Sequence, residues 1–394
     1  MSEIKKLIER LCPDGVEYKK LGEILDYEQP TKYIVSSKDY INEGIPVLTA
    51  GQTFILGYTD ENTGIYCASK EKPVIIFDDF TTSFHWVTFD FKVKSSAMKM
   101  LRPINDDIVF RFIYYAMKCI KYETADHARQ WISKYSLFEI PVPPIEVQSK
   151  IVEYLDNFTE LEAELEAELE ARRKQYEYYR NQLLTFDKVG GARFDVKWMK
   201  LGEIGTFARG NGLQKKDFVD TGFPCIHYGQ IYTRYGLSTK ETITYCSEEL
   251  AEKLVKAKTG DMIIACTSEN IEDVCKAVVW LGKGEAATGG HACVFSHNQD
   301  PKYVAYYFQT EQFFNQKKKY ANGVKVIDIK AVDLAKILIP IPPLAEQERI
   351  VSILDRFEAL TTDLQSGLPA EIEARRKQYE YYREQLLTFE RKYA

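Results

Sequence analysis

The chain has 394 residues, of which 45% are hydrophobic and 13% aromatic, a composition typical of a folded protein and not of a disordered one. No run approaches the roughly 20 apolar residues that a membrane span needs, and the N-terminal segment MSEIKKLIERLC lacks the apolar core of a signal peptide. The eight cysteines are scattered without a C-x-x-C pair, which indicates reduced thiols. We therefore expect a cytoplasmic protein of two or three domains that does not associate with membranes.

The net charge of −6 is unevenly distributed along the chain. Residues 144–186 contain 5 basic and 10 acidic side chains, whereas residues 187–342 contain 21 basic and 18 acidic ones. The remaining parts, 1–143 and 343–394, each have a net charge of −2. Because the acidic groups concentrate in one short segment, charge alone neither establishes nor excludes contact with DNA phosphates.

Short elements occupy the first 143 residues. The segments KLGEI (20–24) and GIPVLTAGQ (44–52) come first, and the apolar runs at 74–80 and 85–93 predict strands. FRFIYYAMKCI (110–120) predicts a helix that ends in a lysine-bearing loop. This mixture of strands and helices predicts a globular α/β domain over residues 1–143.

Residues 144–186 predict one long helix. The prolines at 143 and 144 precede it, and apolar residues then recur at steps of three and four over about 40 residues, or about 60 Å. Its middle, LEAELEAELE (161–170), consists of strong helix formers, so the helix should run through it unbroken. We interpret this four-residue repeat either as a ruler between two domains or as an ordinary solvated acidic face.

The second half of the chain repeats the first. EARRKQYEYYRNQLLTF (170–186) returns at 373–389 with one difference in seventeen positions, and IPVPPIEVQSKIVEYLDNFTEL (140–161) matches the segment at 339–360. KLGEI recurs at 200–204, and GIPVLTAGQ matches GFPCIHYGQ (222–230). The helical parts are nearly identical, whereas the preceding parts share only short segments. One part of the repeat thus performs the same task twice, and the other performs a related task with a different result.

The second copy predicts the same kinds of element. Strands are expected at 261–267 and 276–282, a helix at 302–316, and a long helix at 343–389 with a break near Gly367 and Pro369, where Ser366 caps the restarted helix. Helices of this length cannot bury their apolar stripes in a small domain, so they should pack on each other as an antiparallel coiled coil. The predicted fold is α+β, with pseudo-two-fold symmetry and two globular domains separated by two long helices. The predicted divisions are 1–143, 144–186, 187–342 and 343–389.

Sequence signatures of catalysis are missing. The chain has no phosphate-binding G-x-x-x-x-G-K-[ST] motif, and the segments VPPI (142–145) and IPPL (341–344) lack the residues of an amino-methyltransferase N-P-P-[YF] motif. Cys225 near His227, and His291 near Cys293, do not have the spacing of a zinc site. Asp78 and Asp79 are the remaining candidates for a metal-dependent nuclease, but the second copy has no matching carboxylates. We therefore expect no catalytic residues, no metal site and no cofactor bound by this chain.

The combination of features resembles the specificity subunits of type I restriction–modification systems over essentially the whole chain. The residues that carry the resemblance are IPxPP followed by Gln148–Ile151 and Gln347–Ile350, together with the duplicated EARRKQYEYYR. The resemblance implies two target-recognition domains that each read half of a split double-stranded DNA site. It further implies helices that dock two methyltransferase subunits and, through them, nuclease–translocase subunits. S-adenosylmethionine, ATP and Mg²⁺ would then be bound by the other subunits.

Candidate DNA-binding residues are the basic, amide and aromatic side chains of the two dissimilar domains, because such groups read base edges. In the first domain they are Lys32, Tyr33, Gln52, Thr53, Arg129, Gln130 and Trp131. In the second they are Arg209, Asn211, Lys215, Lys216, His227, Tyr228, Gln230, Arg234 and Lys325. Gln52 and Gln230 are equivalent in the repeat, so they form the favoured pair, although each also fits a solvated turn. The run Lys317–Lys319 is a candidate phosphate contact or a solvated helix end.

Candidate partner-binding residues lie on the duplicated helices. Their near-identity extends around both faces, yet pairing the two helices needs only one, so the other face should bind two copies of one partner. The residues expected there are Arg172, Arg173, Tyr176 and Tyr179, with their equivalents Arg375, Arg376, Tyr379 and Tyr382. Two alternatives stay open, namely a structural coiled-coil adaptor without a DNA role and a nuclease with an unrecognised site.

Overall fold

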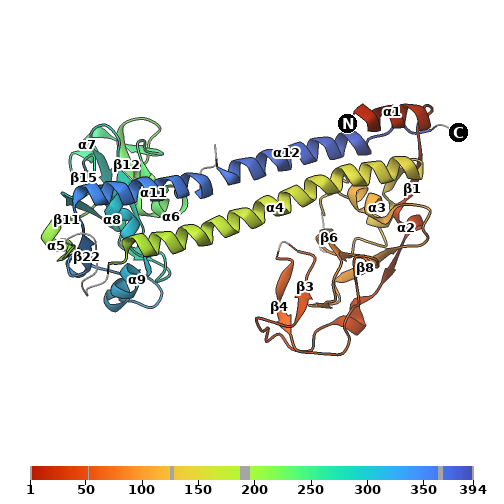
Figure 1. The fold of residues 1–394 in the computed structure, drawn as a ribbon, viewed down its shortest axis with the longest axis horizontal. Helices are drawn as coiled ribbons and strands as arrows, with labels where there is room; N and C mark the ends of the chain where they lie inside the picture. Colours follow the sequence, from red (N-terminus) through yellow and green to blue (C-terminus); the bar gives the residue numbers. More distant parts are fainter. Residues whose placement is uncertain (1, 52, 125–127, 187–195, 363–366, 393–394) are drawn as a thin grey trace. The chain divides into compact units, whose positions relative to one another are not determined.

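The computed structural model describes residues 2–51, 53–124, 128–186, 196–362 and 367–392 (Figure 1). The chain forms two compact units. The first consists of Met1–Glu166 and Ile372–Ala394, and the second of Ala167–Glu371. Each unit therefore contains one of the dissimilar domains together with segments of the long helices.

Two small β-sheets form the globular part of the first unit. Their strand orders are β2-β8-β5-β6 and β4-β3-β7, and every pair is antiparallel except β3–β7. The strands of this unit are β1 (Glu17–Lys20), β2 (Leu25–Glu28), β3 (Ile45–Leu48), β4 (Ile55–Thr59), β5 (Val74–Asp78), β6 (Phe84–Val87), β7 (Lys92–Val93), β8 (Met98–Pro103) and β9 (Glu139–Val142). Its short helices are α1 (Ser2–Leu11), α2 (Leu21–Ile24), η1 (Pro30–Tyr33), α3 (Phe110–Met117) and η2 (Tyr135–Leu137). The single strand predicted at 85–93 is wrong, because β6 and β7 are separate strands; between them the Asp90 side chain accepts a hydrogen bond from the Ala68 backbone N–H at 3.1 Å.

The globular part of the second unit has larger sheets. A five-stranded sheet has the order β11-β20-β16-β18-β13, a four-stranded sheet has the order β14-β12-β19-β15, and β17 pairs with β21. The strands are β10 (Lys197–Lys200), β11 (Gly205–Arg209), β12 (Phe223–Ile226), β13 (Ser238–Thr239), β14 (Thr244–Cys246), β15 (Val255–Ala257), β16 (Met262–Ala265), β17 (Thr267–Ser268), β18 (Ala277–Trp280), β19 (Ala286–Thr288), β20 (Ala292–His297), β21 (Ile327–Asp328) and β22 (Leu338–Ile341). The short helices are α5 (Leu201–Ile204), η3 (Lys215–Asp217), α6 (Tyr228–Thr233), α7 (Glu248–Ala251), α8 (Pro301–Tyr307), α9 (Glu311–Lys317), η4 (Lys318–Tyr320) and α10 (Ala331–Leu334).

The helix predicted at 302–316 is two helices, α8 and α9. Thr310 separates them, because its side-chain oxygen accepts a hydrogen bond from the Phe313 backbone N–H at 3.2 Å and so caps α9. A threonine within an apolar run is a weak sequence signal for such a start, since threonine also occurs inside helices.

The long helices agree with the prediction from the repeat. α4 runs unbroken from Ile145 to Leu184, through the whole acidic repeat. Its counterpart is interrupted as predicted, because α11 (Leu344–Thr362) ends before Gly367 and α12 (Leu368–Leu387) begins after it. The proposed cap Ser366 lies outside the described residues. Among the described helices, none is both long enough and apolar enough to cross a membrane.

Within each unit, the sequence segments that recur in both copies lie next to one another. β1, which precedes KLGEI, pairs with β9 of IPVPP, and β10 pairs in the same antiparallel way with β22. The backbone N–H groups of Leu21 and Leu201 then bind the carbonyl oxygens of Phe138 and Ile337, both at 2.9 Å. The duplicated segments thus form a common framework at the base of both globular domains.

A buried glutamine connects this framework to the globular domain in each copy. The Gln148 amide accepts a hydrogen bond from the Val109 N–H at 2.8 Å, ahead of α3, and donates one to the Pro143 carbonyl at 2.7 Å. Gln347 accepts from the Asp300 N–H at 3.0 Å, ahead of α8, and donates to the Pro342 carbonyl at 2.9 Å. The glutamine of the motif is therefore structural.

A second duplicated contact holds the same helices. Asp156 of α4 accepts hydrogen bonds from Arg111 Nε at 2.8 Å and from the Tyr115 hydroxyl. In the second unit, Asp355 of α11 accepts from Lys302 Nζ at 2.8 Å and from the Tyr306 hydroxyl at 2.7 Å. Each globular domain is thus fixed to the first half of a long helix by a cation and a tyrosine.

The long helices pair antiparallel within each unit. In the first unit the ring of Phe158 lies 5.6 Å from that of Tyr382, and Arg376 binds Glu162 at 2.6 Å. In the second unit the ring of Phe357 lies 5.5 Å from that of Tyr179. The two aromatic pairs join equivalent positions of the repeat, as pseudo-two-fold symmetry requires.

Segments from near the two ends of the chain pair in the first unit. The Val16 N–H donates to the Glu390 carbonyl at 2.9 Å, and the Lys392 N–H donates to the Val16 carbonyl at 2.9 Å. Gly15 permits this approach: its φ is +84°, and a Cβ there would lie 2.6 Å from the Glu390 carbonyl oxygen.

Candidate DNA-reading surfaces and partner-binding helices

Polar and aromatic side chains from four segments meet in the second unit. The ring of Tyr228, at the start of α6, lies 4.5 Å from that of His227 and 4.8 Å from that of His291. His291, just before β20, contacts the Thr267 hydroxyl of β17 at 3.1 Å. Arg209 at the end of β11 reaches the same region, because its Nε donates to the Gly290 carbonyl at 3.2 Å. We call these five residues the reading cluster.

The electrostatics of His227 suit a hydrogen-bond donor. Burial lowers its pKa, and the nearby charges of Lys215 and His291 lower it further, so the ring is neutral at pH 7. Its Nδ1 accepts a hydrogen bond from the Gly229 N–H at 3.2 Å, which places the ring proton on Nε2. His227 and Thr267 are themselves buried, so the donors that the cluster can offer to base edges and phosphates are chiefly the Arg209 guanidinium and the Tyr228 hydroxyl.

Arg209, Lys215, His227 and Tyr228 were predicted to contact DNA, and the structure brings them together, but His227 is buried and its ring supports Tyr228 instead of facing outward. His291 and Thr267 were missed, because they lie far along the chain from the GFPCIHYGQ motif that marked the region. Lys216, Arg234 and Lys325 are exposed and stay candidates.

Two predicted residues of this domain have structural roles. The Asn211 side chain donates to the Lys253 carbonyl at 2.9 Å and accepts from the Val255 N–H at 3.1 Å, so it holds two loops together. Gln230 accepts from the His227 N–H at 3.0 Å and contacts the Thr244 hydroxyl at 3.2 Å. Its amide is engaged in capping α6, so the expectation of a free base reader is wrong for Gln230.

The first unit has a different arrangement at the matching place. His85 Nε2 lies 3.0 Å from the Gly51 carbonyl, and the ring of Phe54 stacks on His85 at 4.6 Å. Phe89 is partly exposed beside Phe54, with the two rings 6.2 Å apart. Burial lowers the pKa of His85, so this ring is also neutral at pH 7. Thr53 is exposed here, whereas Gln52, the favoured residue of this domain, lies outside the described residues.

Lys32 and Tyr33 lie on η1. Lys32 is largely exposed and its Nζ lies 3.5 Å from Glu28, while the Tyr33 hydroxyl donates to Glu28 at 2.9 Å. Burial, with the hydrogen bond to Glu28, raises the pKa of Tyr33 to about 12. Lys32 thus remains available to a phosphate, and Tyr33 is partly occupied by its carboxylate partner.

The prediction is wrong for Gln130 and Trp131, which are buried. Gln130 accepts from the Tyr122 hydroxyl at 2.8 Å, and the Trp131 N–H donates to Asp79 at 2.8 Å. Their aromatic and amide groups suit a base reader and a domain core equally well, and the sequence pattern does not separate the two uses. Arg129 remains a candidate, with its guanidinium half exposed and 4.0 Å from Asp79.

The expected partner face of the long helices is largely turned inward. Tyr176 is buried in the second unit, and Tyr179 lies against Phe357. In the first unit the rings of Tyr379 and Tyr382 lie 6.4 and 5.6 Å from that of Phe158. The prediction is therefore wrong for Tyr176. Tyr379 and Tyr382 chiefly hold the helices together, and Tyr179, which is 40% exposed, stays a candidate.

The arginines of this set bind neighbouring side chains of the helices. Arg172 contacts Glu168 and Gln175, Arg375 contacts Gln378, and Arg376 bridges Glu162 and Glu166. Arg173 is exposed.

The outward face carries other side chains. Tyr178 and its repeat equivalent Tyr381 are each 60% exposed. At the starts of the long helices, Ile145 is 50% exposed and its equivalent Leu344 54%. Large apolar residues are thus exposed at equivalent positions of both copies.

Comparisons with known proteins agree with this picture. The family model described as "Type I restriction modification DNA specificity domain" matches residues 13–171 and again 195–374. The chain belongs to this family of specificity subunits. It is 43% identical to the type I restriction enzyme EcoR124I/EcoR124II specificity subunit of Escherichia coli over 99% of this chain and 98% of that one. It is 22% identical to the MjaVIII specificity subunit of Methanocaldococcus jannaschii, over 88% and 85% of the two chains.

Solved structures are similar in fold. The type I S subunit from M. genitalium superposes with a TM-score of 0.54 at 14% identity, over 95% of this chain and 96% of that one. A chain from a study of complex assembly and conformational transition in the type I system gives 0.59 at 14% identity, over 95% and 98%.

The carboxylates considered for a nuclease have other partners in this specificity subunit. Asp79 and Lys99 are both buried and form an ion pair at 3.2 Å. Asp78 accepts hydrogen bonds from the Phe80 and Thr81 backbone N–H groups, both at 2.9 Å. Within the described residues, no group of three or more His, Cys, Asp or Glu side chains is placed to hold a metal ion.

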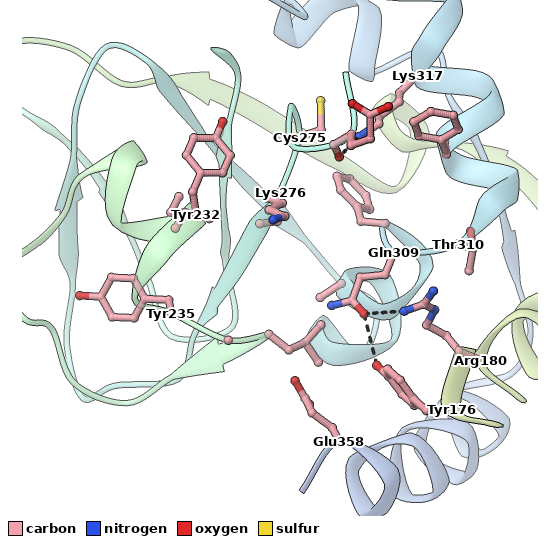
Figure 2. A pocket seen from close by; sticks show the side chains of 18 residues that line it. Tyr176, Arg180, Tyr232, Tyr235, Cys275, Lys276, Gln309, Thr310, Lys317 and Glu358 are labelled. Atoms are coloured by element: carbon pink, nitrogen blue, oxygen red, sulfur yellow. Dashed lines mark hydrogen bonds between the residues drawn. The ribbon is translucent and has the colours of Figure 1, made fainter. Parts of the chain in front are cut away.

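A cavity of about 440 Å³ lies in the second unit of the specificity subunit, between the end of α4, the α8–α9 turn and β18 (Figure 2). Tyr176 and Arg180 each bind the Gln309 side-chain oxygen at 3.2 Å on its wall. Lys317 points to backbone carbonyls at 2.6 and 2.9 Å and is buried, so it is not the phosphate contact considered for the run Lys317–Lys319. The reading-cluster residues do not line this cavity.

The pH dependence of stability should reveal the charge of Glu358 on the cavity wall. Burial, with the nearby charge of Asp355, raises the pKa of Glu358, so folding favours its protonated form. The cost of the charged form is fully present above the raised pKa of the folded state, declines as the pH falls through that pKa, and is absent below the ordinary value of about 4.3. Glu358→Gln should therefore raise the unfolding temperature at pH 7.5 and change it little near pH 4. The exposed Glu252→Gln is the control in calorimetry, and a gain independent of pH would contradict the assignment.

Proposed function

We propose that this specificity subunit reads an interrupted, asymmetric double-stranded DNA sequence with its two dissimilar domains and holds two methyltransferase subunits on its long helices. The observation that carries the proposal is the contrast between duplicated and divergent contacts. The glutamine, aspartate and aromatic contacts that fix the helices recur in both copies, whereas the reading cluster of the second unit has no match in the His85–Phe54 arrangement of the first. Nearly identical helices suit two copies of the same partner. The dissimilar surfaces of the two domains suit two different DNA half-sites.

In this proposal the chain itself is not catalytic. The engagement of Asp78 and Asp79 in a turn and a buried ion pair supports a structural role for the carboxylates that a nuclease would need. S-adenosylmethionine, ATP and Mg²⁺ would be bound by the methyltransferase and nuclease–translocase subunits. The adaptor alternative gives no reason for two different clusters of donors and aromatic rings on the globular domains.

The test is to map methylated adenines in cells that contain this chain with its methyltransferase subunits. We expect one interrupted, non-palindromic motif, because each domain should read its own half-site. Replacing residues 1–143 with the corresponding domain of another specificity subunit should change one half-site and leave the other intact. A palindromic motif, or a change in both half-sites, would refute the two-reader arrangement.

The docking surfaces should contain the exposed duplicated tyrosines. Tyr178 and Tyr381 occupy equivalent positions, so each should anchor one methyltransferase subunit. Tyr178→Ala should leave one subunit bound, because truncation of an interface aromatic costs about 2 kcal/mol, or roughly 30-fold in affinity. Native mass spectrometry measures the stoichiometry, and the Tyr178→Ala/Tyr381→Ala double variant should bind none. Ile243→Ala, at a residue that is also exposed, is the control; two subunits on the double variant would exclude this surface.

The acidic repeat in α4 should set the gap between the half-sites. Deleting residues 163–166 shortens the helix by about 6 Å and turns its ends by about 400°, a net of about 40°. Leu169 and Glu170 then replace the buried Leu165 and the Arg376 partner Glu166, so the local contacts are refilled by identical residue types.

DNA turns about 34–36° per base pair, so we expect the gap to shorten by one base pair with unchanged half-sites. Duplicating the same four residues is the matched control and should lengthen the gap by one. Methylome sequencing measures the gap in both variants. A variant complex that still methylates DNA with the parental gap would contradict the idea that the acidic repeat sets the distance between the half-sites.

A further inference from the structure

A narrow loop with an apolar tip projects from the second unit. Val324 is 96% exposed and Val326 57%. Asn322 and Asp328 close the neck of the loop with two backbone hydrogen bonds of 3.0 and 2.8 Å. Gly323 has a φ of +106°, and a Cβ there would lie 2.0 Å from the Val326 carbonyl oxygen. The neck of the loop is therefore fixed by its own backbone contacts, and the tip extends beyond them into solvent.

The loop is anchored beside the reading cluster. β21 pairs with β17, with Asp328 opposite Thr267 and Ile327 opposite Ser268. Asp328 also lies 3.8 Å from the Arg209 guanidinium. The neck thus shares Thr267 and Arg209 with the surface that offers donors to DNA.

The charge around the loop favours a nucleic acid over a protein partner. Residues 317–330 contain five lysines and a single acidic residue. Lys318, Lys319, Lys325 and Lys330 are exposed. Flanking cations suit phosphates on both sides of a groove, while an apolar tip suits a base.

We propose that Val324 is a specificity-determining residue that contacts the C5-methyl group of a thymine in the major groove of the second half-site. This proposal rests on the proposed function. Apolar side chains contact the thymine methyl, which marks the T·A pair in that groove. A wedge between base steps is usually a larger residue such as Phe, Leu or Met. The short, branched valine instead matches a single methyl group, with Lys325 beside it for the backbone.

The first experiment compares methylomes of the parent, Val324→Ala and Val332→Ala complexes. Val332 is 67% exposed on α10, outside the loop, and serves as the matched control. We expect Val324→Ala to relax one T·A position of the half-site read by residues 187–342 and to leave the other half-site unchanged. Val332→Ala should behave like the parent.

The second experiment replaces the thymine at that position with deoxyuridine in a synthetic duplex. The parental complex should bind this duplex about fourfold more weakly, the effect of losing one buried methyl contact. Val324→Ala should bind the two duplexes equally, because its contact is already lost.

An unchanged motif with the full deoxyuridine penalty in Val324→Ala would overturn the assignment. So would a variant that loses methyltransferase subunits while keeping its base preference, since the loop would then be a protein contact. A parental complex without any interrupted motif would refute the proposed function itself, whatever Val324 does.

Discussion

The structure of each half depends on one buried glutamine. Gln148 and Gln347 each accept a backbone N–H at the entrance of a domain helix and donate to the proline carbonyl that precedes a long helix. Both side chains are almost completely buried, so an unmet hydrogen bond there would cost about 1–3 kcal/mol. Together with the ion pairs of Asp156 and Asp355, they make the globular domain and the first half of its helix one body. A reading surface can then be placed on DNA by the helix that carries it.

This division of labour explains why the copies diverge unevenly. The framework of β1 with β9 and β10 with β22 must fit the same helix twice, so its residues recur. The sheets of both domains pack against these duplicated segments in a common core, yet they differ in strand number and in surface chemistry. The two domains carry different ring contacts above equivalent frameworks. The first has His85 with Phe54, and the second has Tyr228 with His291.

The long helices, the break near Gly367 and the α+β domains could be predicted, because they follow from repetition, periodicity and proline chemistry. The sequence did not predict which side of each long helix faces inward. Near-identity over 170–186 covers all faces, so the pattern did not show which tyrosines face outward: the prediction chose Tyr176 and Tyr179 for the partner face, whereas packing buries Tyr176 and exposes Tyr178. Gln130 and Trp131 were misassigned for a related reason, since an amide and an aromatic ring serve a domain core as well as a base, and here the Gln130 amide binds Tyr122 while the Trp131 ring packs on Phe77. The four divisions of the chain expected from the repeat stay a prediction.

The pairing of the chain's two ends has a topological consequence. Because Val16 hydrogen-bonds to Glu390 and Lys392, the last segment of the second copy lies against the beginning of the first. The first unit therefore combines residues from both ends of the chain, Met1–Glu166 with Ile372–Ala394. Its framework is complete only when the end of the second copy has been made and has packed onto the first, so the first unit cannot fold to completion ahead of the rest of the chain.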